Sequence, residues 1–395
     1  MSTSKSRHKR PWVAKHIADL PKSGIRDFFD IVSTMKEVIS LGIGEPDFVT
    51  PWNIREATIY ALNKGNTAYT SNLGDLKLRK AIAAHAEEAF QASYNPETEI
   101  IVTVGVSEAL DILMRAVLEP GDEVLYHEPC YVSYAPTVRM THAVPVPVMT
   151  YEKNDFVLDV KDLEAAVTPR TKVLLLNYPN NPTGAGLTLD DKKALANFAI
   201  KHNLLVISDE IYEELSYFPR SMSIAALPGM KERSILLNGM SKAYAMTGFR
   251  LGYACGPHEI IDAMMKVHQY SMLCASSISQ AAALEALLHC DAEKENMRKE
   301  YEQRRNVIVK RLNAMGLHCF MPRGAFYVFP CITSTGLTSM EFATRLLREK
   351  HVAVVPGTAF GSCGEGFVRC SYATSMEEIE EAMRRIKDFI ATLRK

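Results

Sequence analysis

The chain of 395 residues lacks the features of a membrane or nucleic-acid-binding protein. It has no run of 18 apolar residues, so we expect no transmembrane helix. Its 45 Lys and Arg residues nearly balance its 46 Asp and Glu residues. The resulting formal net charge of -1 gives no bulk attraction to nucleic acid or to an anionic membrane surface, so we expect neither partner.

The eight cysteines lack the spacing of a metal site or a redox pair, since the chain has no C-x-x-C sequence and no Cys/His cluster. Scattered cysteines in a chain of this length are typical of reduced, mostly buried residues, which predicts a cytoplasmic protein without a metal. The basic start, MSTSKSRHKR, is not followed by the apolar core of a secretory signal. We interpret it as a solvated tail, with an amphipathic import segment as the alternative.

Common motifs of nucleotide-binding and hydrolytic enzymes are also absent. The chain contains no G-x-x-x-x-G-K-[ST], H-E-x-x-H or G-x-S-x-G sequence, and no G-x-G-x-x-G loop between a strand and a helix. Tyr60 and Lys64 have the Tyr-x-x-x-Lys spacing of short-chain dehydrogenases. Without a glycine-rich loop upstream, they are better explained as part of a surface helix that ends before Gly65.

What the chain does have is an alternation of short apolar runs with helical periods. This pattern is typical of a mostly parallel sheet covered on both faces. From residue 291 the sequence pattern changes, beginning with a long charged helix that ends at Gly316. We expect a large α/β domain at 50–290, and a smaller α+β domain at 291–395 that residues 1–49 join. Strands are expected at 99–105, 122–129, 172–179, 204–212, 234–240, 251–257, 324–330 and 351–357, and helices at 107–118 and 189–202.

Two turns at strand ends could bind a ligand. Gly105, Val106 and Ser107 lie between a strand and a helix, where N–H groups favour an anion such as phosphate. A plain turn with Ser107 as the helix cap explains them equally. Asn181, in NYPNNPTG (177–184), follows another strand at the edge where α/β sheets bind ligands. It either donates to a ligand oxygen or closes an Asx turn.

Charged residues also follow the apolar runs. Asp209 ends one, where a carboxylate is costly unless it caps a helix or pairs with a cation, and Tyr212 lies three residues on. Lys242 lies among small and apolar residues, and desolvation makes a lysine amine nucleophilic, as Schiff-base chemistry needs. Arg250, in an apolar stretch, requires an anion, and a phosphate suits its geometry. Together these residues supply a nucleophilic amine, an acid, polar donors and a phosphate-binding turn, which are the groups that pyridoxal phosphate requires.

Over essentially its whole length the chain resembles the class I, fold-type I aminotransferases, which use pyridoxal phosphate (PLP). Within them it is similar to the gamma subgroup of prokaryotic aspartate and aromatic aminotransferases. The resemblance implies a three-layer large domain with a mostly parallel seven-stranded sheet, a smaller α+β domain and a homodimer with shared sites. The matching motifs are LGIGEPDF (41–48), AYTSNLGDLKLRKAI (68–82), NYPNNPTG, ISDEIYEEL, SKAYAMTGFRLGY, RGAFYVFP (323–330) and VAVVPGTAFG with GFVRCSYA (352–373).

The resemblance also implies roles around the cofactor ring. Lys242 forms the Schiff base and moves the proton, and Asp209 pairs with the ring nitrogen. Asn181 and Tyr212 hydrogen-bond the phenolic oxygen, while Tyr131 stacks on the ring.

Phosphate and substrate contacts are implied in the same way. Gly105, Val106, Ser107 and Arg250 hold the phosphate together with Tyr69 of the neighbouring subunit. Arg369 binds the substrate α-carboxylate, Gly44 brings the backbone close to the substrate and Ile43 walls the pocket, beside Tyr131 and Asn181.

The implied activity is transfer of the α-amino group of an L-amino acid to a 2-oxo acid such as 2-oxoglutarate by a ping-pong mechanism. Bacterial aspartate-specific members carry a lysine at the position of Ser107, and a serine cannot pair with a distal carboxylate. An aromatic or broad-range donor is therefore favoured, with aspartate as the alternative. A PLP-dependent β-lyase is the nearest rival function, followed by a catalytically silent PLP-binding regulator.

Overall fold

The computed structural model describes residues 12–20, 37–219 and 222–393. The basic start of the chain, residues 1–10, lies outside these residues. Among the described helices, none combines the length and the apolar character that crossing a membrane requires. All eight cysteines are free and five of them are buried, as their scattered positions predicted.

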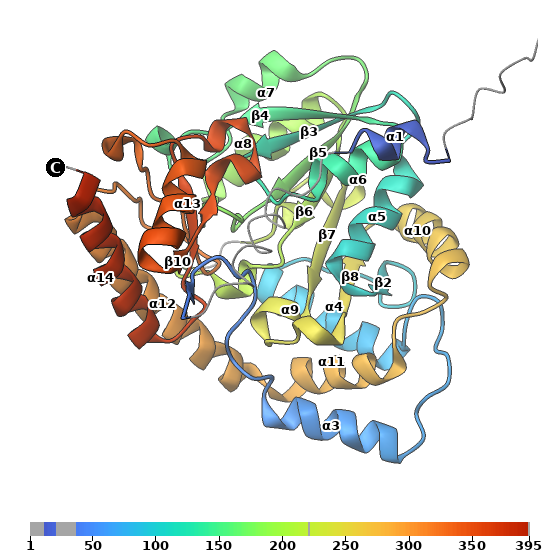
Figure 1. Ribbon diagram of the computed structural model, residues 1–395. Coiled ribbons are helices and arrows are strands. Elements are labelled where there is room, and N and C mark those ends of the chain that lie inside the picture. The colour runs from blue at the N-terminus through green and yellow to red at the C-terminus, as the bar shows by residue number, and fades with distance from the viewer. Residues whose placement is uncertain (1–11, 21–36, 220–221, 394–395) are drawn as a thin grey trace, which may run out of the picture.

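A seven-stranded sheet in the order β2-β8-β7-β6-β5-β3-β4 forms the centre of the molecule (Figure 1). Neighbouring strands from β7 to β4 are parallel, and β8 runs antiparallel to both of its neighbours. The mostly parallel seven-stranded sheet is therefore confirmed. The strands are β2 (Ile100–Thr103), β3 (Glu123–Glu128), β4 (Val144–Met149), β5 (Thr171–Asn177), β6 (Leu205–Asp209), β7 (Ser234–Gly239) and β8 (Gly252–Cys255).

Strand β4 was not among the strands expected from the apolar runs. Its sequence, VPVPVM, contains two prolines, which cannot donate a backbone hydrogen bond and therefore argue against a central strand. The strand lies at the end of the sheet and pairs with β3 alone in the sheet order, a position where proline is tolerated.

Helices cover both faces of the sheet, because successive strand side chains point to opposite sides. In β5, Val173 and Leu175 join the apolar cluster beneath one helical layer, whereas Leu174 and Leu176 join the cluster beneath the other. The first layer contains α5 (Gly105–Val117), α6 (Tyr134–Met140) and α10 (His258–Ser271). The second contains α4 (Leu76–Phe90), α7 (Val160–Ala166), α8 (Leu189–Lys201) and α11 (Ser277–His289). Helix α3 (Trp52–Asn63) packs on α11. Two further helices, α1 (Lys15–Ala18) and α9 (Met240–Ala243), are short.

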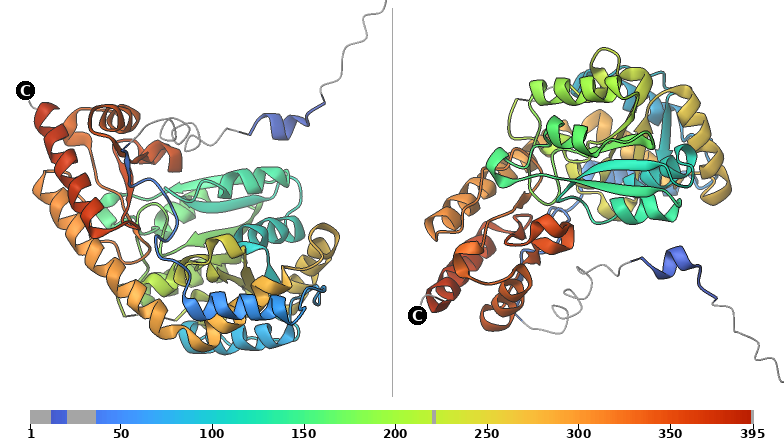
Figure 2. Two further views of the ribbon diagram at one scale, coloured as in Figure 1. Left: turned by 60° about the horizontal axis from the view of Figure 1, so that its bottom comes forward. Right: turned by 90° about the horizontal axis from the view of Figure 1, so that it is seen from above.

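A second part of the molecule, which we call the small lobe, lies beside the sheet (Figures 1 and 2). It comprises residues 37–49 and 291–393, and most of its buried apolar side chains form one cluster. Its strands are β1 (Ile39–Ser40) paired with β10 (Val352–Ala353), and β11 (Val355–Pro356), β12 (Val368–Ser371) and β9 (Tyr327–Val328); its helices are α12 (Asp291–Ala314), α13 (Ser339–Lys350) and α14 (Met376–Leu393). The parallel β1–β10 pair ties the chain before α3 to this lobe. The predicted domain bounds at 49/50 and 290/291 stay a prediction.

Strands β2, β5, β6 and β7 run in one direction, so their carboxyl ends meet at the same edge of the sheet. That edge also receives the start of α5, which follows β2, and the start of α9, which follows β7. Such an edge is where ligands bind in open α/β sheets.

Candidate active site

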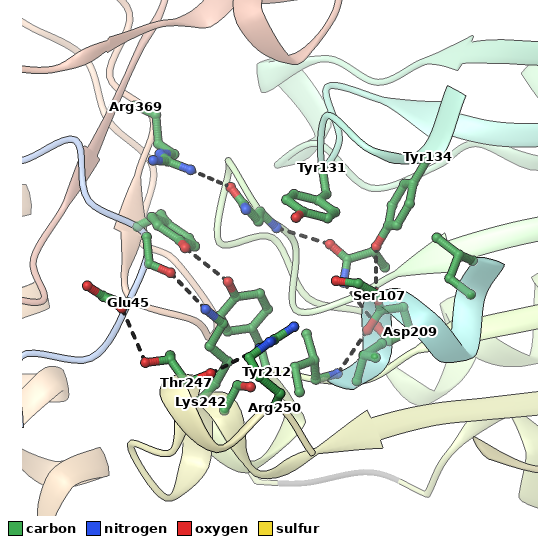
Figure 3. A pocket seen from close by; sticks show the side chains of 18 of the residues that line it. Glu45, Ser107, Tyr131, Tyr134, Asp209, Tyr212, Lys242, Thr247, Arg250 and Arg369 are labelled. Atoms are coloured by element: carbon green, nitrogen blue, oxygen red, sulfur yellow. Dashed lines mark hydrogen bonds between the residues drawn. The ribbon is translucent and has the colours of Figure 1, made fainter. Parts of the chain in front are cut away.

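A cavity of about 490 Å³ opens at this edge and takes its walls from both the sheet and the small lobe (Figure 3). Ile43 and Tyr69 are not part of its lining, and both side chains are exposed. Gly105 lies next to the lining residues at the start of α5. The sequence-predicted residues in the lining are Gly44, Val106, Ser107, Tyr131, Asn181, Asp209, Tyr212, Lys242, Arg250 and Arg369.

Lys242 reaches the cavity from α9, directly after β7. Its Nζ donates a hydrogen bond to the carbonyl oxygen of Gly44 at 2.7 Å. Burial lowers the pKa of Lys242 to about 8, and the nearby carboxylate of Glu45 opposes this shift. Near pH 8 a large fraction of the amine is therefore unprotonated and nucleophilic.

Asp209 is the buried last residue of β6. Its Oδ2 accepts a hydrogen bond from the Tyr134 hydroxyl at 2.8 Å, and its Oδ1 accepts one from the Ile211 N–H at 3.2 Å. Burial raises the pKa of Asp209 to about 6, and these two hydrogen bonds oppose the shift. Above pH 6 the site therefore holds a buried negative charge, which a cationic group of a ligand would stabilise.

Arg369 enters the cavity from β12. Its Nη1 donates to Oδ1 of Asn181 at 3.0 Å, and its Nη2 donates to the carbonyl oxygen of Gly42 at 2.6 Å. Its Nε is buried and has no hydrogen-bond partner among the described residues. The residue lines the cavity, and a guanidinium is the side chain best suited to pair with a carboxylate.

The start of α5 and Arg250 meet at the cavity. The first-turn N–H groups of a helix, here those around Val106 and Ser107, have no partners within the helix. Arg250 packs against Gly105 so closely that a Cβ there would lie 2.7 Å from Nη2. Ser107 does not cap the helix, since the N-cap is Val104 and no side chain caps it. The cap interpretation of Ser107 is therefore wrong, and the anion-binding interpretation stays a prediction.

The reason given for Arg250 from sequence was wrong. Its apolar neighbours suggested a buried guanidinium, but Arg250 is exposed and its Nη1 donates to the carbonyl oxygen of Thr247 at 3.0 Å. The backbone at Arg250 is left-handed, with φ of 52°, so Leu251 turns into the core while Arg250 turns toward the cavity.

Sequence reasoning missed several lining residues. Tyr134 follows Tyr131 by three residues, and this spacing could have indicated that both face the same site. Glu45 accepts a hydrogen bond from the Thr247 hydroxyl at 3.2 Å (Figure 3). Glu45 and Tyr327 lie within matching motifs, but nothing in those motifs assigned either residue to the cavity, which both reach through the packing of the small lobe.

The chain is similar to known proteins in both sequence and structure. Residues 36–386 match the family model described as aminotransferase class I and II. An aspartate aminotransferase of Pyrococcus abyssi is 49% identical over 368 residues, covering 92% of this chain and 95% of its own. Aromatic-amino-acid aminotransferase 2 of Thermococcus litoralis is 46% identical over 368 residues, with the same two coverages. The crystal structure of an aromatic aminotransferase from Pyrococcus horikoshii OT3 matches with a TM-score of 0.89 at 47% identity, covering 94% of this chain and 99% of that one.

Proposed function

Because the chain belongs to the class I and II aminotransferases, and is thus a PLP-dependent aminotransferase, we propose that it moves the α-amino group of an aromatic or broad range of L-amino acids to a 2-oxo acid such as 2-oxoglutarate. The two substrates use the same cavity in turn, as a ping-pong mechanism requires. The observation that carries the proposal is the meeting of Lys242, Asp209 and Arg369 in one cavity.

The residues of the cavity fit PLP. Lys242 would bind its aldehyde carbon, and the buried carboxylate of Asp209 would pair with its ring nitrogen. The start of α5 and Arg250 would bind its phosphate. Arg250 lies so close to Gly105 that a Cβ at this position would not fit. When bound, PLP supplies an electron sink for the bond that breaks at the substrate α-carbon.

The chain's own groups position the substrate and move its proton. The guanidinium of Arg369, which enters the cavity beside Asn181, would hold the α-carboxylate. Nζ of Lys242, which the Gly44 oxygen holds at the cavity wall, would take the proton from the α-carbon. Its lowered pKa of about 8 leaves a large fraction of the amine free to accept that proton near pH 8.

The proposed donor preference rests on Ser107, because a serine cannot form an ion pair with the distal carboxylate of aspartate. Among the described lining residues the cations are Lys242, Arg250 and Arg369, and each already has a role in the proposal. This subunit therefore offers no further cation for a distal carboxylate, which favours an aromatic or uncharged donor. The relatives divide by name between aspartate and aromatic amino acids.

Single half-reactions would test the donor. Amino acids are added one at a time to the PLP-loaded protein without an acceptor, and the loss of the visible cofactor absorbance is followed. Phenylalanine and tyrosine should react at least about tenfold faster than aspartate. In the variant Ser107→Lys the aspartate rate should rise, because a lysine there can pair with the distal carboxylate. A wild-type preference for aspartate over both aromatic donors would contradict the assignment.

We also propose that the protein acts as a homodimer in which Tyr69 reaches the phosphate site of the neighbouring subunit. Tyr69 is 81% exposed, so it is available for such a contact. Exposed apolar side chains occur nearby, on α3 and at and just after the end of α10. Hydrogen bonds from Ser277 and Gln280 tie the segment of Tyr69 to the start of α11. These exposed side chains are Trp52, Ile59, Tyr60, Leu62, Tyr270, Met272 and Leu273.

Light scattering and a cofactor titration test the dimer. The mass in solution should be twice the 44.0 kDa of the chain. Tyr69→Phe should weaken PLP binding about fivefold, the effect of losing one hydrogen bond, whereas Tyr270→Phe should leave PLP binding unchanged. A monomer that binds PLP normally would be incompatible with shared sites.

A further inference from the structure

Tyr327 lies where the small lobe meets the cavity. It begins β9, is fully buried and lines the cavity from the small lobe. Its partner in the antiparallel β9–β12 pair is Ser371, two residues after Arg369. Because side chains two residues apart share a face of a strand, Tyr327 and Arg369 project from the same face of this small sheet.

The hydroxyl of Tyr327 makes two close contacts across the cavity. It lies 2.9 Å from the hydroxyl of Tyr212, which follows β6 of the large sheet. It also lies where a Cβ on residue 44 would come within 2.9 Å, so Gly44 leaves the space that the hydroxyl occupies. The Tyr212–Tyr327 hydrogen bond thus links the small lobe to the large sheet.

The ring of Tyr327 makes a different contact. The Cζ atom of Arg369 lies 4.6 Å from the ring centroid, within the range of a cation–π interaction. The same guanidinium donates to Asn181. One side chain therefore contacts the carboxylate-binding arginine through its ring and Tyr212 through its hydroxyl.

The direction of the Tyr212–Tyr327 hydrogen bond follows from the number of protons available. A tyrosine hydroxyl has one proton to donate and can accept at the same time. When Tyr212 donates its proton to a ligand, Tyr327 must be the donor of the bond between the two hydroxyls. A donor behind Tyr212 polarises its O–H group and strengthens the bond that Tyr212 makes to the ligand.

We propose that Tyr327 is a positioning residue with two separable actions: its hydroxyl holds Tyr212 as a donor to the phenolic oxygen of PLP, and its ring holds Arg369 for the substrate carboxylate. This inference rests on the proposed function, since it assigns partners to Tyr212 and Arg369 within that function. The first action crosses from the small lobe to the large sheet and requires the two to lie together, whereas the second takes place within the small lobe.

Two variants separate the two actions. Tyr327→Phe removes the hydroxyl and keeps the ring, so Tyr212 becomes a weaker donor and negative charge on the phenolic oxygen is less stabilised. The pKa read from the pH titration of the bound cofactor's visible absorbance should then rise by about 0.5 to 1, while the KM for the amino acid changes less than about twofold. Tyr327→Leu removes the ring as well, and should give the same rise in pKa together with a KM about tenfold higher.

A matched control exists in the same lobe. Tyr372 is buried, and its hydroxyl lies within hydrogen-bond distance of the Tyr217 hydroxyl, at 3.2 Å, and of the Ala325 carbonyl oxygen, at 3.0 Å, away from the cavity lining. Tyr372→Phe should leave both the cofactor pKa and the KM unchanged. A cofactor pKa in Tyr327→Phe equal to that of the wild type would overturn the proposal, as would an equal rise in Tyr372→Phe. Absence of a cofactor band in the wild type would instead count against the proposed function itself.

Discussion

Replacing Lys242 with alanine is expected to lower kcat by at least about 10⁴-fold, because the protein loses the group that would move the α-proton. It also loses its nucleophilic amine, so the visible absorbance of the protein-bound cofactor should disappear. Lys242 is suited to these tasks because burial lowers its pKa to about 8 and because the Gly44 oxygen holds its Nζ at 2.7 Å. Steady-state rates with phenylalanine and 2-oxoglutarate, and an absorbance spectrum of the same sample, provide the measurement.

A lysine outside the cavity provides the control for this substitution. Lys266 on α10 is exposed and forms an ion pair with Asp262 at 2.7 Å. Lys266→Ala should keep the wild-type rate and spectrum. Retention of full activity in Lys242→Ala would show that the chemistry does not depend on this amine.

Replacing Asp209 with asparagine is expected to lower kcat/KM by about 10²–10³-fold, the usual effect of removing one preorganised electrostatic partner. The carboxylate is buried and ionised above a pKa of about 6, so it can pair with a protonated ring nitrogen, whereas a neutral amide cannot. Asp122 precedes the amino end of β3, at the opposite end of the strand from the site, and Asp122→Asn should retain wild-type kinetics. Wild-type kcat/KM in Asp209→Asn would contradict the assigned pairing.

The same substitution has a predicted effect on stability in the cofactor-free protein. Folding raises the pKa of Asp209 from 3.8 to about 6, so the folded state binds this proton more tightly. The associated stability is fully present below pH 3.8 and is lost as the pH rises through 6, which costs about 3 kcal/mol at pH 7. Thermal unfolding at pH 7 should therefore show Asp209→Asn to be at least as stable as the wild type without PLP. A clear loss of stability at this pH would show that the buried, ionised carboxylate does not destabilise the cofactor-free protein.

Much of the site could be predicted from sequence because its residues follow buried strands. Asn181, Asp209 and Lys242 come at or just after apolar runs, and the carboxyl ends of parallel strands meet at one edge. Each run therefore indicated both a strand and the place where its last polar residue would lie. The seven-stranded sheet followed from the resemblance, although the prolines of β4 concealed one of its strands.

What local patterns could not show depends on backbone direction and on contacts between distant segments. Arg250 has apolar neighbours, but its left-handed backbone turns it out of the core. Tyr134 contacts Asp209 only because α6 folds back over the end of β6. Tyr327 is surrounded by aromatic and aliphatic residues in the sequence, and nothing in that run distinguishes the one side chain that faces Tyr212.

A PLP-dependent β-lyase is the rival that shares most of these residues, because the electron sink belongs to the cofactor. The two reactions differ in their products. A transferase keeps the amino group on the cofactor until a 2-oxo acid accepts it, whereas a lyase releases ammonia at each turnover.

The most direct test is therefore to mix the PLP-loaded protein with excess phenylalanine, and separately with excess cysteine, in the absence of any 2-oxo acid acceptor, and to measure both products. We expect one 2-oxo acid per active site from phenylalanine, no ammonia from either amino acid, and continued turnover with phenylalanine once 2-oxoglutarate is added. Continued release of ammonia without an acceptor, or no 2-oxo acid from any amino acid tested, would contradict it.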